Sequence, residues 1–203
     1  MGLMGYIGEQ FHKPTGLGGR LATFIMNRQN DRQYRGVEAA IDLQDSDIAL
    51  DIGFGNGYLL CRLARNYGCH LYGIDISKDM LHVASSRGRR FIREGRMILS
   101  LGDALQTGLP SDLFDKAYTV NTVYFWSDLS SGLAETWRIL KPGGVFINAV
   151  YTKAFLDTLP VTRHGYAKYS IEHLVKTGEK IGFEVTPQAI VDGKAYCIIY
   201  RKP

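Results

Sequence analysis

Three glycines spaced two residues apart form the pattern that most clearly suggests chemistry. Gly53, Gly55 and Gly57 follow an apolar segment typical of a strand and precede one typical of a helix. Glycine lets a ligand approach the backbone, and a helix N-terminus offers unpaired N–H groups to an anionic group. We interpret the segment as a nucleotide-binding loop, with a glycine-rich turn that binds nothing as the alternative. Its G-x-G-x-G spacing differs from the G-x-G-x-x-G of dinucleotide enzymes.

Two aspartates follow at the ends of the next two predicted strands. Asp75 lies 22 residues after Gly53, and a carboxylate about 20 residues beyond such a loop is placed to bind both ribose hydroxyls. Asp75 could instead cap the next helix, but Ser77 can cap that helix by itself, which favours the ribose role. Asp103 could accept a hydrogen bond from an exocyclic amine of a base or cap a turn, and the residues alone leave both open.

Strands and helices alternate along most of the chain and would position these residues. Short runs rich in Val, Ile and Tyr predict strands at 48–53, 70–75, 97–101, 116–120, 145–151, 184–191 and 195–200. Helical patterns predict helices at 57–67, 78–88, 129–140 and 171–181. This alternation favours a parallel, doubly wound α/β sheet with helices on both faces. The last two strands are separated only by 192–194, which leaves no room for a crossover helix and predicts an antiparallel hairpin.

The length and composition favour one globular core. The chain has 203 residues, of which 45% are hydrophobic and 22% charged, values that exclude a disordered or fibrous protein. The net charge of +4 is a mild excess that neither requires nor excludes an anionic partner. We expect a core domain at 47–203, preceded by an arm or lid at 1–46 with helical stretches at 21–27 and 33–41.

The order and spacing of these elements resemble the class I S-adenosylmethionine-dependent methyltransferases. Two further segments agree: 114–121 is similar to the fourth-strand segment of that family, and 140–144 is similar to the turn before its fifth strand. The resemblance runs from about residue 47 to the C-terminus and is greatest to the group that includes the ubiquinone and menaquinone biosynthetic C-methyltransferases. It implies a three-layer Rossmann-like fold whose mostly parallel sheet ends in an antiparallel hairpin.

The resemblance also implies a cofactor, S-adenosyl-L-methionine, with S-adenosyl-L-homocysteine as the product. At its methionine end, the three loop glycines Gly53, Gly55 and Gly57 would line the pocket. Asp51 would shape the loop and face the ammonium group, and Asn121 would lie under the methionyl portion.

At the adenosine end, the resemblance assigns the ribose to Asp75 and the adenine face to Ile76. Asp103 and the backbone of Ala104 would meet the adenine edge. The sequence departs from the family pattern at Phe54, where many members have a small or polar residue. The Phe54 ring could narrow the pocket or pack in the core.

Candidate acceptor-binding residues follow the fourth strand or lie in connecting segments. Tyr124, Phe125 and Trp126 come directly after that strand, where an acceptor should lie, although aromatic residues most often serve packing. We expect Tyr124 or Trp126 to reach the acceptor. His12, in the glycine-rich part of the arm, and His164, after the fifth strand, are candidate bases or substrate residues, although a lone histidine is more often a surface residue. The sequence identifies no catalytic base.

The acceptor is expected to be a small molecule rather than RNA or protein. The chain has no N/D-P-P-Y/F/W segment and no Pro-Cys pair, which disfavours methylation of bases in nucleic acid. The arginines between residues 87 and 96 could contact RNA, but they fall near a helix C-terminus at the opposite end of the sheet from the expected site. A non-catalytic cofactor-binding protein and an NAD-dependent oxidoreductase are the alternatives from other classes.

The remaining features concern the compartment. The chain has three cysteines and no CxxC pair, so we expect a reducing, cytoplasmic setting. It has no signal-peptide pattern and no apolar run long enough for a membrane span. We expect no membrane partner and no metal site, and the sequence does not indicate an oligomeric state.

Overall fold

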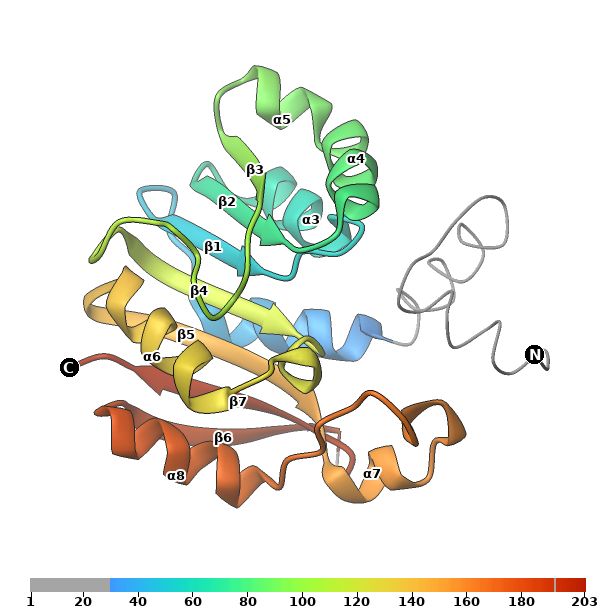
Figure 1. Ribbon diagram of the computed structural model, residues 1–203. Coiled ribbons are helices and arrows are strands. Elements are labelled where there is room, and N and C mark those ends of the chain that lie inside the picture. Colours follow the sequence, from blue (N-terminus) through green and yellow to red (C-terminus); the bar gives the residue numbers. More distant parts are fainter. Residues whose placement is uncertain (1–29, 192) are drawn as a thin grey trace.

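The computed structural model describes residues 30–191 and 193–203 and contains a seven-stranded sheet (Figure 1). Its strands are β1 (Ile48–Ile52), β2 (His70–Asp75), β3 (Met97–Leu101), β4 (Phe114–Val120), β5 (Leu140–Tyr151), β6 (Glu184–Val191) and β7 (Ala195–Arg201). They lie in the order β3-β2-β1-β4-β5-β7-β6. The first five are parallel, and β7 pairs antiparallel with both β5 and β6. The predicted fold class and terminal hairpin are confirmed.

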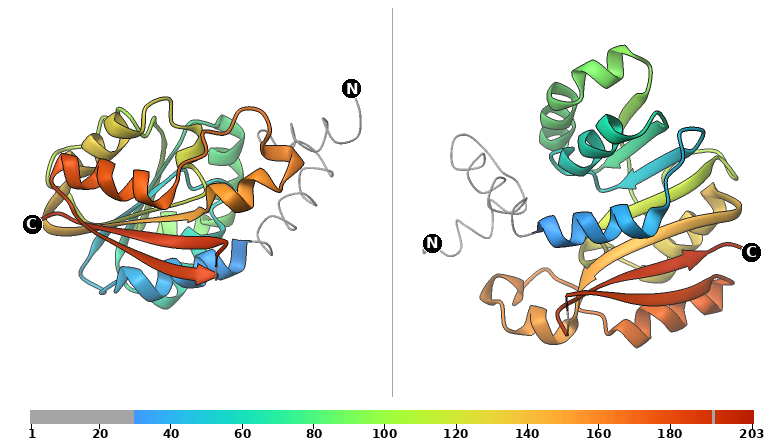
Figure 2. Two further views of the ribbon diagram at one scale, coloured as in Figure 1. Left: turned by 90° about the horizontal axis from the view of Figure 1, so that it is seen from below. Right: turned by 180° about the vertical axis from the view of Figure 1, so that it is seen from behind.

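Helices cover both faces of this sheet and give the molecule three layers (Figure 2). They are a helix over residues 30–41 (helix 30–41), α3 (Tyr58–Asn66), α4 (Lys78–Arg87), α5 (Arg89–Arg93), α6 (Leu129–Ile139), α7 (Lys153–Asp157) and α8 (Ile171–Ile181). Two short 3₁₀ turns, η1 (Val123–Phe125) and η2 (Pro160–Thr162), complete the described elements. Within the described ranges, no helix has the length and hydropathy needed to cross a membrane.

Two hydrophobic clusters fill the spaces between the layers. On one face, Val37 of helix 30–41, Leu63 of α3 and Ala84 of α4 share a buried cluster. On the other face, Leu133 of α6 and Leu174 of α8 belong to a second cluster. The central strands contribute residues to both clusters, for example Ala49 and Leu50 of β1, as is usual for parallel strands buried on both faces. Helix 30–41 therefore packs into the core, together with α3 and α4.

Several bounds differ by one or two residues from the sequence-based expectations, and β5, α5 and α7 differ most. β5 begins at Leu140 rather than at residue 145, because Leu140 pairs with Phe114 before the register shifts and Val145 pairs with Lys116. The Pro-Gly-Gly segment that resembles a turn is thus an irregularity within one strand. The five-residue helices α5 and α7 are too short to show a clear period in the sequence. The expected helical stretch at 21–27 lies outside the described residues.

Candidate functional site

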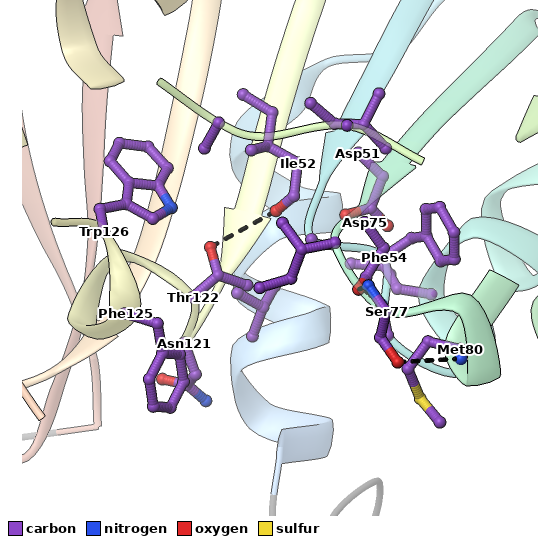
Figure 3. Close-up of a pocket in the computed structure, with 18 of the residues that line it drawn as sticks. Asp51, Ile52, Phe54, Asp75, Ser77, Met80, Asn121, Thr122, Phe125 and Trp126 are labelled. Atoms are coloured by element: carbon purple, nitrogen blue, oxygen red, sulfur yellow. Dashed lines mark hydrogen bonds between the residues drawn. The ribbon is translucent and has the colours of Figure 1, made fainter. Parts of the chain in front are cut away.

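A cavity of about 510 Å³ lies at the carboxyl ends of β1, β2 and β4. The strand order reverses around β1, and such a switch point is where open α/β sheets bind ligands. The glycine loop, the segments after β2, β3 and β4, and helix 30–41 form its walls. Figure 3 shows Phe54 and Asp75 on one side of the cavity and Asn121, Phe125 and Trp126 on the other.

The three loop glycines have different structural roles. Gly53, at φ +78°, lies so close to the β4 end that an added Cβ would be 2.5 Å from Thr122 Cγ2. Gly57 is the N-cap residue of α3, at φ +69°, and an added Cβ there would be 2.8 Å from the Ala84 Cβ. Gly53 and Gly55 line the cavity, whereas Gly57 is not among the lining residues and serves the packing of α3 on α4. A Cβ at Gly55 would meet nothing within 4 Å, so this part of the loop faces open space.

Asp75 joins the end of β2 to the glycine loop. Its Oδ2 accepts a hydrogen bond from the Gly55 N–H at 2.8 Å, and its Oδ1 accepts one from the Ser77 N–H at 2.9 Å. Burial raises the pKa of Asp75, and these backbone donors partly oppose that effect. The Ser77 hydroxyl caps α4 by accepting from the Met80 N–H, as expected. Each Asp75 oxygen keeps a further lone pair for a ligand in the cavity.

Asp51 is a buried acid on the floor of the cavity. Only 5% of its surface is exposed, and it lies opposite Tyr118 in the register of β1 and β4. Burial raises the pKa of Asp51 well above its usual value, the Tyr118 hydroxyl partly offsets this, and the charge of Asp75 adds to it. None of the ion pairs between described residues includes Asp51. A cationic ligand would relieve the cost of holding this carboxylate in its charged form.

The segments after β2 and β3 provide the wall expected to face adenine. Ile76, Asp103 and Ala104 all line the cavity. Ile76 is 76% exposed, which is unusual for a large aliphatic side chain and leaves an apolar surface available to a flat ring. Asp103 Oδ1 accepts a hydrogen bond from the Leu105 N–H at 2.9 Å, so Asp103 caps a turn and also borders the cavity.

The end of β4 and the η1 turn form the opposite wall. Asn121, Thr122, Phe125 and Trp126 line the cavity, and the Phe125 side chain is 45% exposed. Tyr124 is not among the lining residues and is buried, which raises the pKa of its hydroxyl. Of the two aromatic residues expected to reach the acceptor, the structure therefore brings Trp126 to the cavity and leaves Tyr124 in the core.

Helix 30–41 contributes two lining residues that sequence reasoning missed, Asn30 and Tyr34. The Tyr34 ring packs against Tyr58 with 5.5 Å between ring centroids, and burial raises the pKa of Tyr34 to about 12. No local motif marks these residues. The helical pattern that starts at Gln33 was the available signal, but it does not reveal that the helix borders the glycine loop.

The other candidates lie apart from the cavity or outside the described residues. His164 is exposed and does not line the cavity. His12 falls in the segment before residue 30, which the structure does not describe. Phe54 is 6% exposed and lines the cavity, so its ring both narrows the pocket and packs on the core. The described residues form no cluster of His, Cys, Asp and Glu that could hold a metal ion.

The donor set fits S-adenosylmethionine better than a dinucleotide. The described lining residues include three aspartates but no lysine, arginine or histidine. Such a wall suits the ammonium and sulfonium of the methyl donor, whereas the anionic pyrophosphate of NAD gains nothing from three nearby carboxylates. The open space beside Gly55 leaves room for a ligand against the backbone, and Asp75 offers two oxygens to two ribose hydroxyls.

Comparison with known proteins agrees with this fit. Residues 50–148 match the family described as a methyltransferase domain. The chain is 32% identical over 125 residues to the uncharacterized methyltransferase YdaC of Bacillus subtilis. The matched region covers 61% of this chain and 67% of YdaC. It is 25% identical over 165 residues to phosphoethanolamine N-methyltransferase 2 of Caenorhabditis elegans, covering 79% of this chain but only 38% of the relative.

Among solved structures, the chain is similar to the methyltransferase in a complex with the Haloferax volcanii Trm112 methyltransferase activator. The TM-score is 0.77 at 21% identity, covering 88% of this chain and 92% of the other, so this likeness concerns the fold. The greater resemblance to the ubiquinone and menaquinone enzymes stays a prediction. The matched domain and the similarity to YdaC, together with the architecture, show that the chain belongs to the class I S-adenosylmethionine-dependent methyltransferases.

Proposed function

We propose that this methyltransferase acts on a small-molecule acceptor that binds between helix 30–41 and the η1 turn. The observation that carries the proposal is the wall formed by Asn30, Phe125 and Trp126, which continues the cavity beyond the glycine loop. Phe125 offers an exposed aromatic surface there. The phosphoethanolamine methyltransferase named above is a relative whose acceptor is itself a small molecule.

The cofactor assignments form part of the same proposal. Asp51 would face the ammonium group, and the backbone at Gly53 and Gly55 would line the methionine end. Asp75 would accept hydrogen bonds from the ribose hydroxyls. Ile76 would cover the adenine face, with Asp103 and Ala104 at its edge, and each of these residues lines the cavity.

The bound cofactor supplies a methyl group already activated by its sulfonium. The chain's own residues therefore mainly have to align the acceptor, and alignment alone contributes several kcal/mol. Aromatic faces such as those of Phe125 and Trp126 can stabilise positive charge by roughly 0.5–2 kcal/mol. The proposal assigns no general base, because one is needed only where the acceptor must lose a proton to become nucleophilic.

Two observations disfavour an RNA acceptor. Residues 89–96 of the arginine-rich segment precede β3 and so lie at the amino ends of the parallel strands, opposite the cavity, whereas Arg87 contacts the cavity-lining residues Asn56 and Tyr58. Arg96 is also engaged within the fold, since its guanidinium donates to the carbonyl oxygens of Ala64 and Tyr67. The proposed arm or lid at 1–46 is described only from residue 30 onward, and its role as a lid stays a prediction.

Transfer of a labelled methyl group from S-adenosylmethionine tests the acceptor class. The protein is incubated with the labelled donor and a cell extract separated into small-molecule, RNA and protein fractions. We expect label in the small-molecule fraction. Label confined to RNA or protein would contradict the small-molecule acceptor. Binding of S-adenosylhomocysteine without transfer to any fraction would instead favour a non-catalytic cofactor-binding protein.

A further inference from the structure

One pair of amide side chains joins helix 30–41 to the end of β4. The Asn121 Nδ2 donates to Gln33 Oε1 at 2.7 Å, and the Gln33 Nε2 donates back to Asn121 Oδ1 at 2.9 Å. Gln33 is 1% exposed, and polar groups this deeply buried are costly to leave without partners. We call this reciprocal pair the amide clasp.

The remaining hydrogen-bonding capacity of Asn121 is also used within the protein. Its Nδ2 donates to Asn30 Oδ1 at 3.1 Å, and its Oδ1 accepts from the Tyr124 hydroxyl at 3.2 Å. A primary amide has two N–H donors and two acceptor lone pairs. Gln33 and Asn30 accept from the two N–H donors, and Gln33 Nε2 and the Tyr124 hydroxyl lie within hydrogen-bond distance of Oδ1. The side chain of Asn121 therefore has nothing left to offer to the methionyl part of a cofactor.

The contacts of Asn121 reach three parts of the cavity wall. Asn30 belongs to helix 30–41, Asn121 follows β4, and Tyr124 belongs to the η1 turn next to the lining residue Phe125. The Tyr124 hydroxyl in turn lies within hydrogen-bond distance of the Tyr151 backbone at the end of β5. The amide of Asn121 is thus the point at which these three wall segments are connected.

The second half of helix 30–41 has separate anchors. Val37 and Ile41 are fully buried in the core cluster, and Glu38 pairs with Arg62 of α3 at 2.6 Å. Loss of the amide clasp should therefore leave the helix folded and attached, while residues 30–34, which also make the Asp31–Arg62 ion pair at 3.1 Å, become freer to move relative to the end of β4.

We infer that Asn121 and Gln33 are positioning residues that hold residues 30–34 of helix 30–41 and the η1 turn in the arrangement that completes the cofactor pocket. This inference rests on the proposed cofactor site. Gln33 is not among the lining residues, so its effect on a ligand must pass through Asn121 and the helix. The backbone of Asn121 is left-handed at φ +58°, a conformation that glycine adopts without strain.

The test compares Gln33→Met, Asn121→Gly and the double variant by calorimetric titration with S-adenosylhomocysteine. Gln33→Met keeps the length of the side chain and removes its amide, and Asn121→Gly suits the positive φ. We expect each single variant to lower the affinity roughly tenfold. Because both break the same contact, the double variant should be little weaker than either single variant. Gln188→Met, on the exposed side of β6, is the matched control and should bind as the wild type does.

Two readouts separate positioning from a general loss of structure. Hydrogen exchange in Gln33→Met should accelerate at residues 30–34 of helix 30–41 and stay unchanged in α8. In Gln33→Glu, the introduced carboxyl group can replace the amide as donor and acceptor only when it is protonated. The affinity of Gln33→Glu should therefore approach the wild-type affinity as the pH falls. Gln33→Met, measured at the same pH values, serves as the reference and should not gain affinity in this way.

Wild-type affinity in Gln33→Met and Asn121→Gly, or single-variant effects that multiply in the double variant, would overturn the inference. That result would leave the cofactor site intact. If the wild-type protein itself failed to bind S-adenosylhomocysteine, the cofactor site would be refuted instead.

Discussion

Replacement of Asp51 by asparagine should stabilise the free protein while weakening cofactor binding. The Asp51 carboxylate is 5% exposed and, among the described residues, takes part in no ion pair. Burial raises its pKa well above the usual value, and the charge of Asp75 raises it further. In the free protein the charged form is therefore disfavoured, whereas the ammonium group of a bound cofactor would favour it.

The two effects can be sized separately. Single stabilising substitutions commonly contribute about 0.5–2 kcal/mol, and in a chain of this size each 1 kcal/mol raises Tm by roughly 2–4 °C. Loss of a hydrogen bond to a charged group costs about 1.5–3 kcal/mol. The affinity for S-adenosylhomocysteine should therefore fall roughly ten- to a hundredfold, since about 1.4 kcal/mol corresponds to a factor of ten.

Calorimetry measures both quantities on Asp51→Asn. Adenosine is the control ligand, because it lacks the amino-acid part and should bind wild type and variant equally.

The stability difference also has a pH dependence. A raised carboxyl pKa in the folded state destabilises the protein above that pKa, so the advantage of Asp51→Asn should shrink as the pH falls through it. A lower Tm together with unchanged S-adenosylhomocysteine affinity would refute the reasoning.

Three further outcomes are expected. Asp75→Ala should weaken the binding of both adenosine and S-adenosylhomocysteine about tenfold or more, because charge-assisted hydrogen bonds are lost; unchanged titrations would remove Asp75 from the ribose role. The affinity of the wild-type protein for S-adenosylhomocysteine should fall as the pH drops through the raised pKa values of Asp51 and Asp75, because cofactor donors favour both carboxylates; a pH-independent titration would contradict this. Gly57→Ala should lower Tm more than Gly95→Ala. Both positions have a positive φ near 70°, but only a Cβ at Gly57 would crowd a neighbour, the Ala84 Cβ at 2.8 Å. Equal losses of Tm in the two variants would contradict the packing role of Gly57.

Features encoded locally could be predicted from the sequence. β2, β3 and α8 have the bounds expected from their apolar patterns, because each lies between turn residues that end it. The positions of Asp75 and Asp103 at strand ends follow from the parallel arrangement alone. These residues reach one cavity because the carboxyl ends of parallel strands lie at the same edge of the sheet.

Features that depend on distant contacts were not predictable. Gln33 and Asn121 are 88 residues apart, and nothing in either segment indicates that their amides meet. The same applies to Asn30 and Tyr34, whose place in the cavity depends on how helix 30–41 docks. Gly57 was expected to line the pocket, but its close neighbour Ala84 belongs to the next helix, a contact that spacing cannot reveal.

Titration of the wild-type protein with S-adenosylhomocysteine and, separately, with NADH tests the central claim most directly. Saturable binding of S-adenosylhomocysteine at one site per chain is expected, without binding of NADH. At a hundredfold excess over Kd, binding should stabilise the protein by about 2.7 kcal/mol and raise Tm by roughly 5–10 °C. A rise in Tm with NADH and none with S-adenosylhomocysteine would contradict the assignment of this cavity to a methyl donor.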